Sequence, residues 1–208
     1  MLFRSIVKGW STEMSLEVTS LGVQVHGGMG FIEETGAAQF YRDARILTIY
    51  EGTTAIQAND LIGRKTARDG GAVARALNAA IGDTLRALEG RDGDLGAIRN
   101  ALAAGAQSLQ EAVDFIVASA RSDVRAVFAG SVPYLKLAGV VLGGWQLARA
   151  ALAARTLLDA GNPDTGFLAA KIGTARFFAD HILSQAPALR HAIVSGAAGA
   201  LALEDAQF

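Results

Sequence analysis

The sequence predicts an all-α protein, because its apolar residues recur at helical spacing and few residues interrupt them. Apolar residues make up 51% of the 208-residue chain. Much of this share is alanine, which favours closely packed helices over strands rich in valine and isoleucine. Only three prolines are present. A chain of this length can bury one sizeable core, or two small cores that share an interface.

The expected elements follow from the steps between apolar residues and from the residues that break helices. Ser131 is a candidate N-cap, and the paired glycines within 68–72 mark a linker. Helices are expected at about residues 3–22 with a short continuation, from 53 or 54 to 64, from 73 to a turn at 89–94, and at 95–121, 133–158 and 167–183. Residues 33–41 are expected to form one or two helical turns, and residues 42–51 to be irregular or extended.

Three glycines, Gly139, Gly143 and Gly144, fall within one predicted helix. Each costs about 1 kcal/mol relative to alanine in such a position, so something must compensate. Close packing of another helix is the preferred interpretation, and a ligand against the bare backbone is the alternative. Trp10 and Trp145 are expected to fill cores rather than to stack on a cofactor.

Composition argues against several classes of partner. The formal net charge is −1 and no basic cluster is visible along the sequence, which disfavours nucleic acid and anionic membranes as partners. The absence of cysteine removes disulfides and thiolate metal sites, and it fits a cytoplasmic location. His181 and His191 are too far apart in sequence to suggest a metal pair, so no metal is expected.

No membrane or targeting segment is expected either. The N-terminus carries Arg4, Lys8 and Glu13 and lacks the apolar core of a signal peptide. The longest apolar stretch, Leu137 to Ala148, holds Gln146 and is followed by Arg149, which makes it too short and too polar to span a bilayer.

One carboxylate stands out. Glu51 lies between Tyr50 and Gly52 in a turn that precedes a helix. Tyr50 could shield it from water, Gly52 would let a substrate approach the backbone, and Thr53 could cap the helix while offering a hydroxyl to a ligand. An ordinary loop acid is the alternative interpretation of Glu51.

Three motifs in order carry a family resemblance: QVHGGMGF at 24–31, RDARI at 42–46 and YEGT at 50–53. They resemble the C-terminal part of acyl-CoA dehydrogenases. The resemblance implies that Glu51 is the catalytic base, which takes the α-proton of an acyl-CoA while a hydride leaves the β-carbon for FAD. It also implies that the backbone N–H of Glu51 and a flavin hydroxyl polarise the thioester oxygen, and that Gly52 and Tyr50 contact the substrate.

The resemblance further implies FAD contacts in two places. The turn at Gln24, Val25, His26, Gly27 and Gly28 would contact the adenosine diphosphate part of FAD across a subunit interface, although such a turn can equally be a helix C-cap. Thr53, Thr54 and Ala55 would contact the flavin. Some family members have a glutamine at the position of Ala55 that contacts FAD, so alanine leaves only a backbone contact there. His26 is expected to have a local structural role.

Beyond residue 68 the likeness is weaker, and it resembles the extra helical domain of the larger bacterial-type enzymes. We therefore expect a partial acyl-CoA dehydrogenase C-terminal domain at 1–68 and an appended helical domain at 72–208. The arginines Arg42 and Arg45 are expected to pair with Asp43 and to fix the loop before Glu51. We expect a piece of a longer enzyme that forms homo-oligomers and passes electrons to an electron-transferring flavoprotein; the alternative is a truncated, non-catalytic helical module that self-associates.

Overall fold

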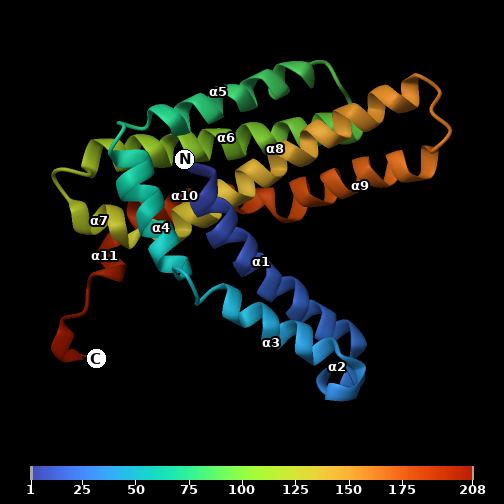
Figure 1. The fold of residues 1–208 in the computed structure, drawn as a ribbon. Coiled ribbons are helices and arrows are strands. Elements are labelled where there is room, and N and C mark those ends of the chain that lie inside the picture. Colours follow the sequence, from blue (N-terminus) through green and yellow to red (C-terminus); the bar gives the residue numbers. More distant parts are fainter. Residues whose placement is uncertain (1, 208) are drawn as a thin grey trace.

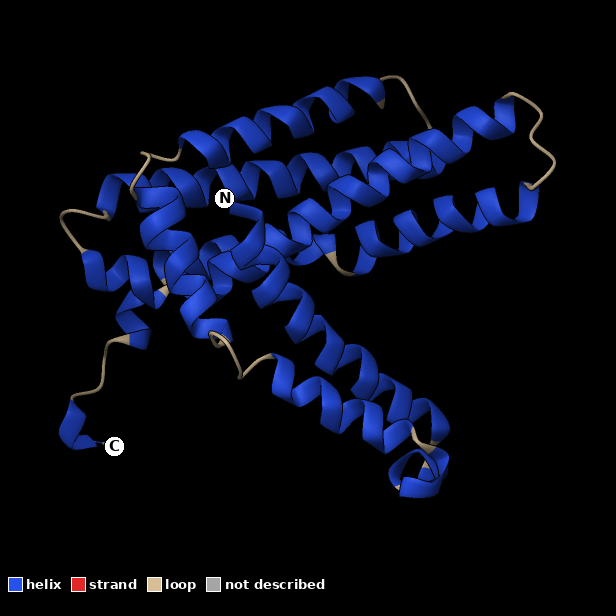
Figure 2. Ribbon diagram, viewed as in Figure 1, coloured by secondary structure: helices blue, strands red, loops and turns tan. Residues whose placement is uncertain are grey.

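The computed structural model describes residues 2–207, and these form helices joined by turns and short loops, with no strand among them (Figure 2). The prediction of an all-α fold is confirmed. The α-helices are α1 (Leu2–His26), α2 (Gly28–Phe31), α3 (Ala37–Leu47), α4 (Thr54–Ile62), α5 (Ala72–Ala87), α6 (Gly93–Ser119), α7 (Val124–Ala129), α8 (Ser131–Asp159), α9 (Thr165–His181), α10 (Ala186–Ser195) and α11 (Ala197–Ala200). Short 3₁₀ turns lie at Glu33–Thr35, Leu183–Gln185 and Asp205–Gln207, and a π-helical turn, η2, spans Gly63–Ala67.

The molecule has two visible parts (Figure 1). Helices α5, α6, α8, α9 and α10 pack along one another in a bundle, whereas the C-terminal half of α1, with α2 and α3, projects from it as an arm. Helix α4 and the N-terminal half of α1 lie against α8 and connect the arm to the bundle. We call the segment formed by residues 12–47 the arm.

Periodic apolar residues explain the bundle. In α6 the expected stripe is buried, as at Leu102, Leu109 and Ile116, because residues three and four apart share one helix face. The linker at 68–71 and the turn after Gly161 also lie where the sequence places them. Trp145 packs against the core and its Nε1 donates to Thr84 Oγ1 at 2.7 Å.

Helix α8 is the longest and most apolar element. The whole helix is long and apolar enough to cross a bilayer by length and composition alone, but this is weak evidence, because the core helix of a helical bundle has the same length and composition. More than half of its most apolar 18-residue window, 56%, is buried against the other helices. That burial is typical of the central helix of a bundle.

Two local predictions are wrong, and three short helices were not predicted. Residues 42–47 are helical rather than irregular, because α3 starts after Gly36, whose φ is 80°, and continues through good helix formers to Leu47. Ser131 does not cap α8: the N-cap position is Gly130, without a side-chain hydrogen bond, and Ser131 is a buried residue within the helix. Helices α7, α10 and α11 were not expected, because they are short and their apolar steps span few turns.

Candidate functional site

The turn between α3 and α4 places Glu51 in an unusual backbone conformation. Its φ is 50°. Among the described residues, 2–207, Glu51 is the one non-glycine residue with a positive φ. Such a conformation costs about 1 to 3 kcal/mol and is frequent at functional sites. Gly52 follows with φ 98°, a backbone conformation that other residues rarely adopt, so this position favours glycine.

Helix α4 begins immediately after this turn. Thr53 is its N-cap: its Oγ1 accepts from the N–H of Ile56 at 3.4 Å. The expected cap is therefore confirmed, and the hydroxyl proton of Thr53 stays free to donate to a ligand. Both donors of Thr54 are engaged within the chain, since its N–H donates to Thr48 O at 3.2 Å and its hydroxyl donates to Glu13. Ala55 is exposed.

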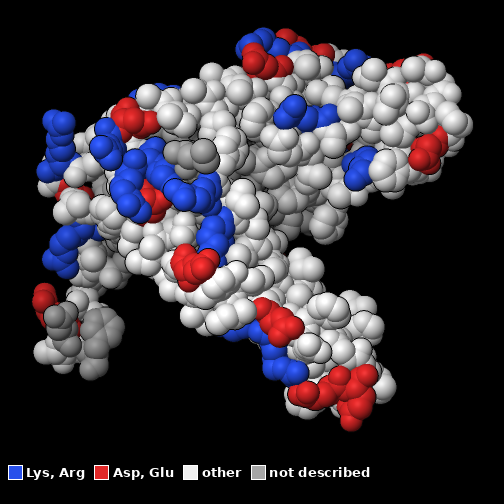
Figure 3. Space-filling model, in the orientation of Figure 1, with Lys and Arg blue, Asp and Glu red and all other residues white. Residues whose placement is uncertain are grey.

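Glu51 opens onto a cavity of about 510 Å³. Arg4 and Lys8 of α1 and Arg64 of η2 bring positive charge to it, and Figure 3 shows lysine and arginine side chains gathered over this end of the molecule. The remaining lining residues are Ile56, Gln57 and Asp60. Glu51 and Tyr50 are both exposed, so the expected shielding of the carboxylate by Tyr50 is not formed by this chain.

Asp60 anchors one wall of this cavity. It accepts from Ser5 Oγ at 2.6 Å, lies 2.7 Å from Lys65 Nζ and pairs with Arg64. Burial raises the pKa of Asp60, but the hydrogen bonds from Lys65, Ser5 and Arg64 outweigh burial and bring it to about 2. The carboxylate of Asp60 on this wall therefore stays ionised at neutral pH.

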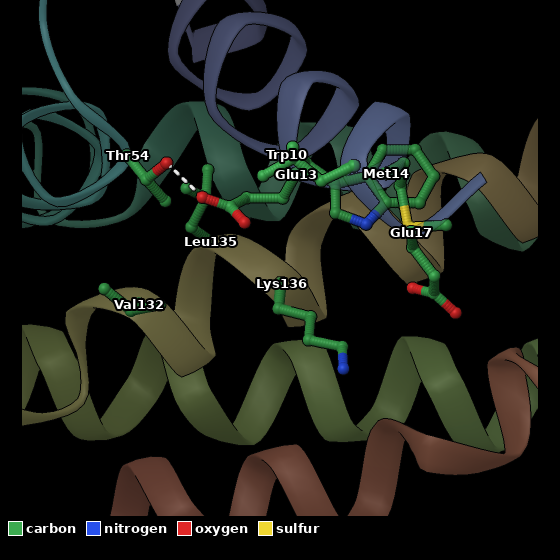
Figure 4. A pocket seen from close by; sticks show the side chains of 9 residues that line it. Trp10, Glu13, Met14, Glu17, Thr54, Val132, Leu135 and Lys136 are labelled. Atoms are coloured by element: carbon green, nitrogen blue, oxygen red, sulfur yellow. Dashed lines mark hydrogen bonds between the residues drawn. The ribbon is translucent and has the colours of Figure 1, made fainter. Parts of the chain in front are cut away.

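A second cavity, of about 410 Å³, lies between α1 and α8 on the other side of the α4 N-terminus (Figure 4). Trp10, Glu13 and Glu17 of α1 face Lys136 of α8 across it, and the Thr54–Glu13 hydrogen bond closes one end. The indole Nε1 of Trp10 is buried without a hydrogen-bond partner among the described residues.

The glycine turn lies far from Glu51. Gln24, Val25 and His26 form the exposed last turn of α1, at the far end of the arm, whereas Glu51 lies at its base (Figure 1). About 24 Å of helix separates Gln24 from Lys8, beside the Glu51 turn. The structure thus brings residues 50–55 together and leaves residues 24–28 apart from them.

The glycine turn itself is open. Gly27, with φ 58°, directly follows the last residue of α1, and its N–H donates to Gln24 O at 3.1 Å. A Cβ atom at Gly27 or Gly28 would meet nothing within 4 Å. Gly28 starts α2, and the first N–H groups of a helix have no intrahelical acceptor. The backbone here is accessible to a hydrogen-bond acceptor such as a phosphate.

Arg42 does not pair with Asp43, as the sequence suggested, but with another carboxylate. Arg42 pairs in a bidentate manner with Glu33, at 2.7 and 3.2 Å, and so joins α3 to the turn at the end of the arm. Lys8 instead contacts the end of α3, just before the Glu51 turn: its Nζ donates to Leu47 O at 2.5 Å. Sequence reasoning missed Lys8 and Arg4. Their spacing of four places them on one face of α1, but it does not say what that face meets.

Two family models cover the chain. Residues 3–66 match the one described as "Acyl-CoA dehydrogenase, C-terminal domain", and residues 71–204 match "Acetyl-CoA dehydrogenase C-terminal like". The chain belongs to the acyl-CoA dehydrogenase family. Both matched regions are C-terminal domains, in agreement with the resemblance of the three motifs.

The curated relatives of this chain agree with the family match. The 3-methylmercaptopropionyl-CoA dehydrogenase of Ruegeria pomeroyi is 52% identical over 88% of this chain and 31% of its own length. The broad-specificity linear acyl-CoA dehydrogenase of Mycobacterium tuberculosis is 32% identical over 100% of this chain and 35% of its own length. A caffeyl-CoA reductase–Etf complex subunit of Acetobacterium woodii is 43% identical over 26% of this chain and 14% of its own. The chain thus spans about a third of the length of the first two relatives.

Proposed function

We propose that this chain supplies the catalytic base of a flavin-dependent acyl-CoA dehydrogenase, and that Glu51 is that base. The observation that carries the proposal is the backbone of Glu51, held at positive φ between Tyr50 and Gly52 over a cavity. A strained residue persists only where its surroundings determine it, and such residues cluster at active sites. The family match and the YEGT motif support the same position.

Glu51 has the chemistry that the reaction needs. A carboxylate within hydrogen-bond reach of the α-carbon can accept its proton, and the gain from a positioned base is about 10² to 10⁴ in rate. The backbone N–H of Glu51 would donate to the thioester oxygen and stabilise the charge that develops there. Gly52 leaves room for the thioester beside that N–H, and Tyr50 flanks it. Water has to be excluded by groups other than Tyr50, since Glu51 is exposed in this chain.

The residues present fit FAD. The open backbone at Gly28 suits the pyrophosphate, whereas the N–H of Gly27 already donates to Gln24 O at 3.1 Å, and Gln24 can offer its side-chain amide there. The free hydroxyl proton of Thr53 suits a flavin acceptor. When bound, FAD would accept the hydride that leaves the β-carbon. Because the glycine turn lies at the opposite end of the arm from Glu51, we propose that it serves the cofactor of a second subunit.

The proposed substrate is an acyl-CoA thioester, which the reaction would convert to the 2,3-enoyl-CoA. The names of the relatives support the thioester class, and the Etf complex subunit among them supports an electron-transferring flavoprotein as the electron acceptor. A division into parts at 1–68 and 72–208 remains part of the proposal.

A non-catalytic module that self-associates is the second candidate function. It is favoured by the exposed apolar side chains of the arm, which include Val18, Leu21, Val25, Met29, Phe31 and Phe40. The two functions separate in one experiment.

The test is Glu51→Gln in a chimaera in which this chain replaces the matching part of the Ruegeria pomeroyi relative. Glutamine is nearly isosteric but cannot accept the α-proton. We expect dehydrogenation to fall about a thousandfold or more, with FAD and acyl-CoA binding retained. Glu89→Gln, in the exposed turn after α5, is the matched control and should change nothing. Activity of the Glu51→Gln chimaera within tenfold of the parent would refute the assignment.

A further inference from the structure

The N-terminal part of α1 is fixed to the rest of the molecule on both sides of Lys8. Ser5 is fully buried and bonds to Asp60, and Ile6 is buried in the core. Gly9 lies in close contact with two other helices: a Cβ there would come within 2.5 Å of Leu135 Cδ2 and 3.2 Å of Gln57 Cβ. The backbone at Lys8 cannot shift without displacing packed groups.

From this fixed backbone Lys8 reaches the turn that carries Glu51. Its Nζ donates to Leu47 O at 2.5 Å and lies 4.5 Å from the centroid of the Tyr50 ring. Leu47 ends α3, and the last carbonyls of a helix have no intrahelical donor. One half-buried ammonium group therefore caps the helix before the turn and holds the ring of the residue next to Glu51 by a cation–π contact.

The turn needs such support because its backbone is strained. Within it, the N–H groups of Ile49 and Tyr50 both donate to Ile46 O, and the Thr54 N–H closes it onto Thr48 O. These bonds join the turn to the ends of α3 and α4. The contacts of Lys8 join it to α1. Arg64 lines the same cavity, but its partner is Asp60 rather than the turn.

We propose that Lys8 is the positioning residue for Glu51: it holds Leu47 and Tyr50 against α1 and so fixes where the Glu51 carboxylate and N–H lie. The inference rests on the proposed function for its catalytic consequence. Its structural part stands on the contacts alone, so the two can be tested separately.

The structural part is tested on the 208-residue chain by hydrogen exchange of the Ile49, Tyr50 and Thr54 amides. Lys8→Met removes the charge and the donor while keeping most of the aliphatic stem, and these amides should exchange at least about tenfold faster. Lys8→Arg retains both contacts and should restore slow exchange. Lys171→Met is the matched control, because Lys171 also lies over an aromatic ring, that of Phe167, but on α9. It should leave the three amides unchanged.

The catalytic part is tested in the chimaera. Misplacement of a catalytic group by about 1 Å can cost about 10²-fold in rate. We expect Lys8→Met to lower kcat ten- to a hundredfold with KM nearly unchanged, Lys8→Arg to restore most of kcat, and Lys171→Met to match the parent. If Lys8→Met does not fold, Lys8→Gln, which keeps a donor without the charge, is measured in both assays and should give an intermediate loss.

The outcomes distinguish the two proposals. Unchanged exchange in both Lys8→Met and Lys8→Gln would overturn the positioning role, as would an unchanged kcat in a chimaera that Glu51→Gln inactivates. Faster exchange in a chain whose Glu51→Gln chimaera stays active would support the contact of Lys8 with the turn and refute Glu51 as the base.

Discussion

Trp10 of α1 lies against the bare backbone of Gly139 in α8. A Cβ on Gly139 would come within 2.7 Å of the indole Cδ1 and nearer still to Cγ and Cδ2. Gly143 faces the far edge of the same ring, with Trp10 Cη2 at 2.9 Å from a Cβ position, and Gly144 faces Leu183. The helical glycines are thus explained by close packing rather than by a ligand, and the helix that carries Lys8 is seated on the bundle through them.

Gly139→Ala should destabilise the chain by about 1 to 3 kcal/mol, because the methyl group overpacks a buried contact with Trp10. Gly173→Ala in α9 is the matched control. Nothing lies within 4 Å of its Cβ position, so the better helix propensity of alanine should raise stability by about 0.5 to 1 kcal/mol. Thermal or denaturant unfolding measures both. A neutral Gly139→Ala would contradict the packing explanation.

Asp60→Asn should remove part of the acid sensitivity of the chain. The folded pKa of Asp60, about 2, lies below its ordinary value of 3.8. Its contribution is therefore complete above about pH 5 and is lost as pH falls from about 4 to 2, which amounts to about 2 kcal/mol. The variant should be less stable at pH 7, because Lys65 loses its buried partner, and it should lose less stability on acidification.

Denaturant unfolding at pH 7, 4 and 3 tests this expectation. Asp83→Asn is the control, since its pair with Arg86 is exposed on both sides and should contribute little. Parallel pH curves for Asp60→Asn and the parent would contradict the role of Asp60.

Gly28→Val should weaken FAD retention in the chimaera without unfolding it. The side chain has open space around it, and the φ of Gly28 is not in the positive range that favours glycine. Its bulk would nevertheless cover the N–H proposed for the pyrophosphate. Gly173→Val, at another open helical glycine, should leave flavin content unchanged. Equal flavin content and melting temperature in Gly28→Val and the parent would argue against the phosphate role.

The 208-residue chain alone should be helical, colourless and inactive, and should form a dimer or a larger oligomer. Its candidate FAD contacts lie at opposite ends of the arm, and the apolar side chains of the arm are exposed. Visible absorbance after purification with added FAD, together with light scattering, tests this. A stoichiometric yellow complex that an acyl-CoA reduces would show the opposite.

Local patterns allowed much of this molecule to be predicted from its sequence. The period of the apolar residues specified the long helices, because burial of one helix face needs only the identity of residues three and four apart. The glycines at 27, 52, 70 and 71 marked turns, and each has a positive φ that favours glycine. The YEGT motif located Glu51, and Thr53 caps the helix after it.

Other features depend on which surfaces meet. Lys8 and Leu47 are 39 residues apart, and no periodicity says that one reaches the carbonyl of the other. The length of α1 separates the glycine turn from Glu51, although their motifs are neighbours in sequence. Packing of α3 back along α1 decides both relationships. Such long-range contacts depend on the shapes of whole helix faces, whereas helix periods, caps and turns depend on residues a few positions apart.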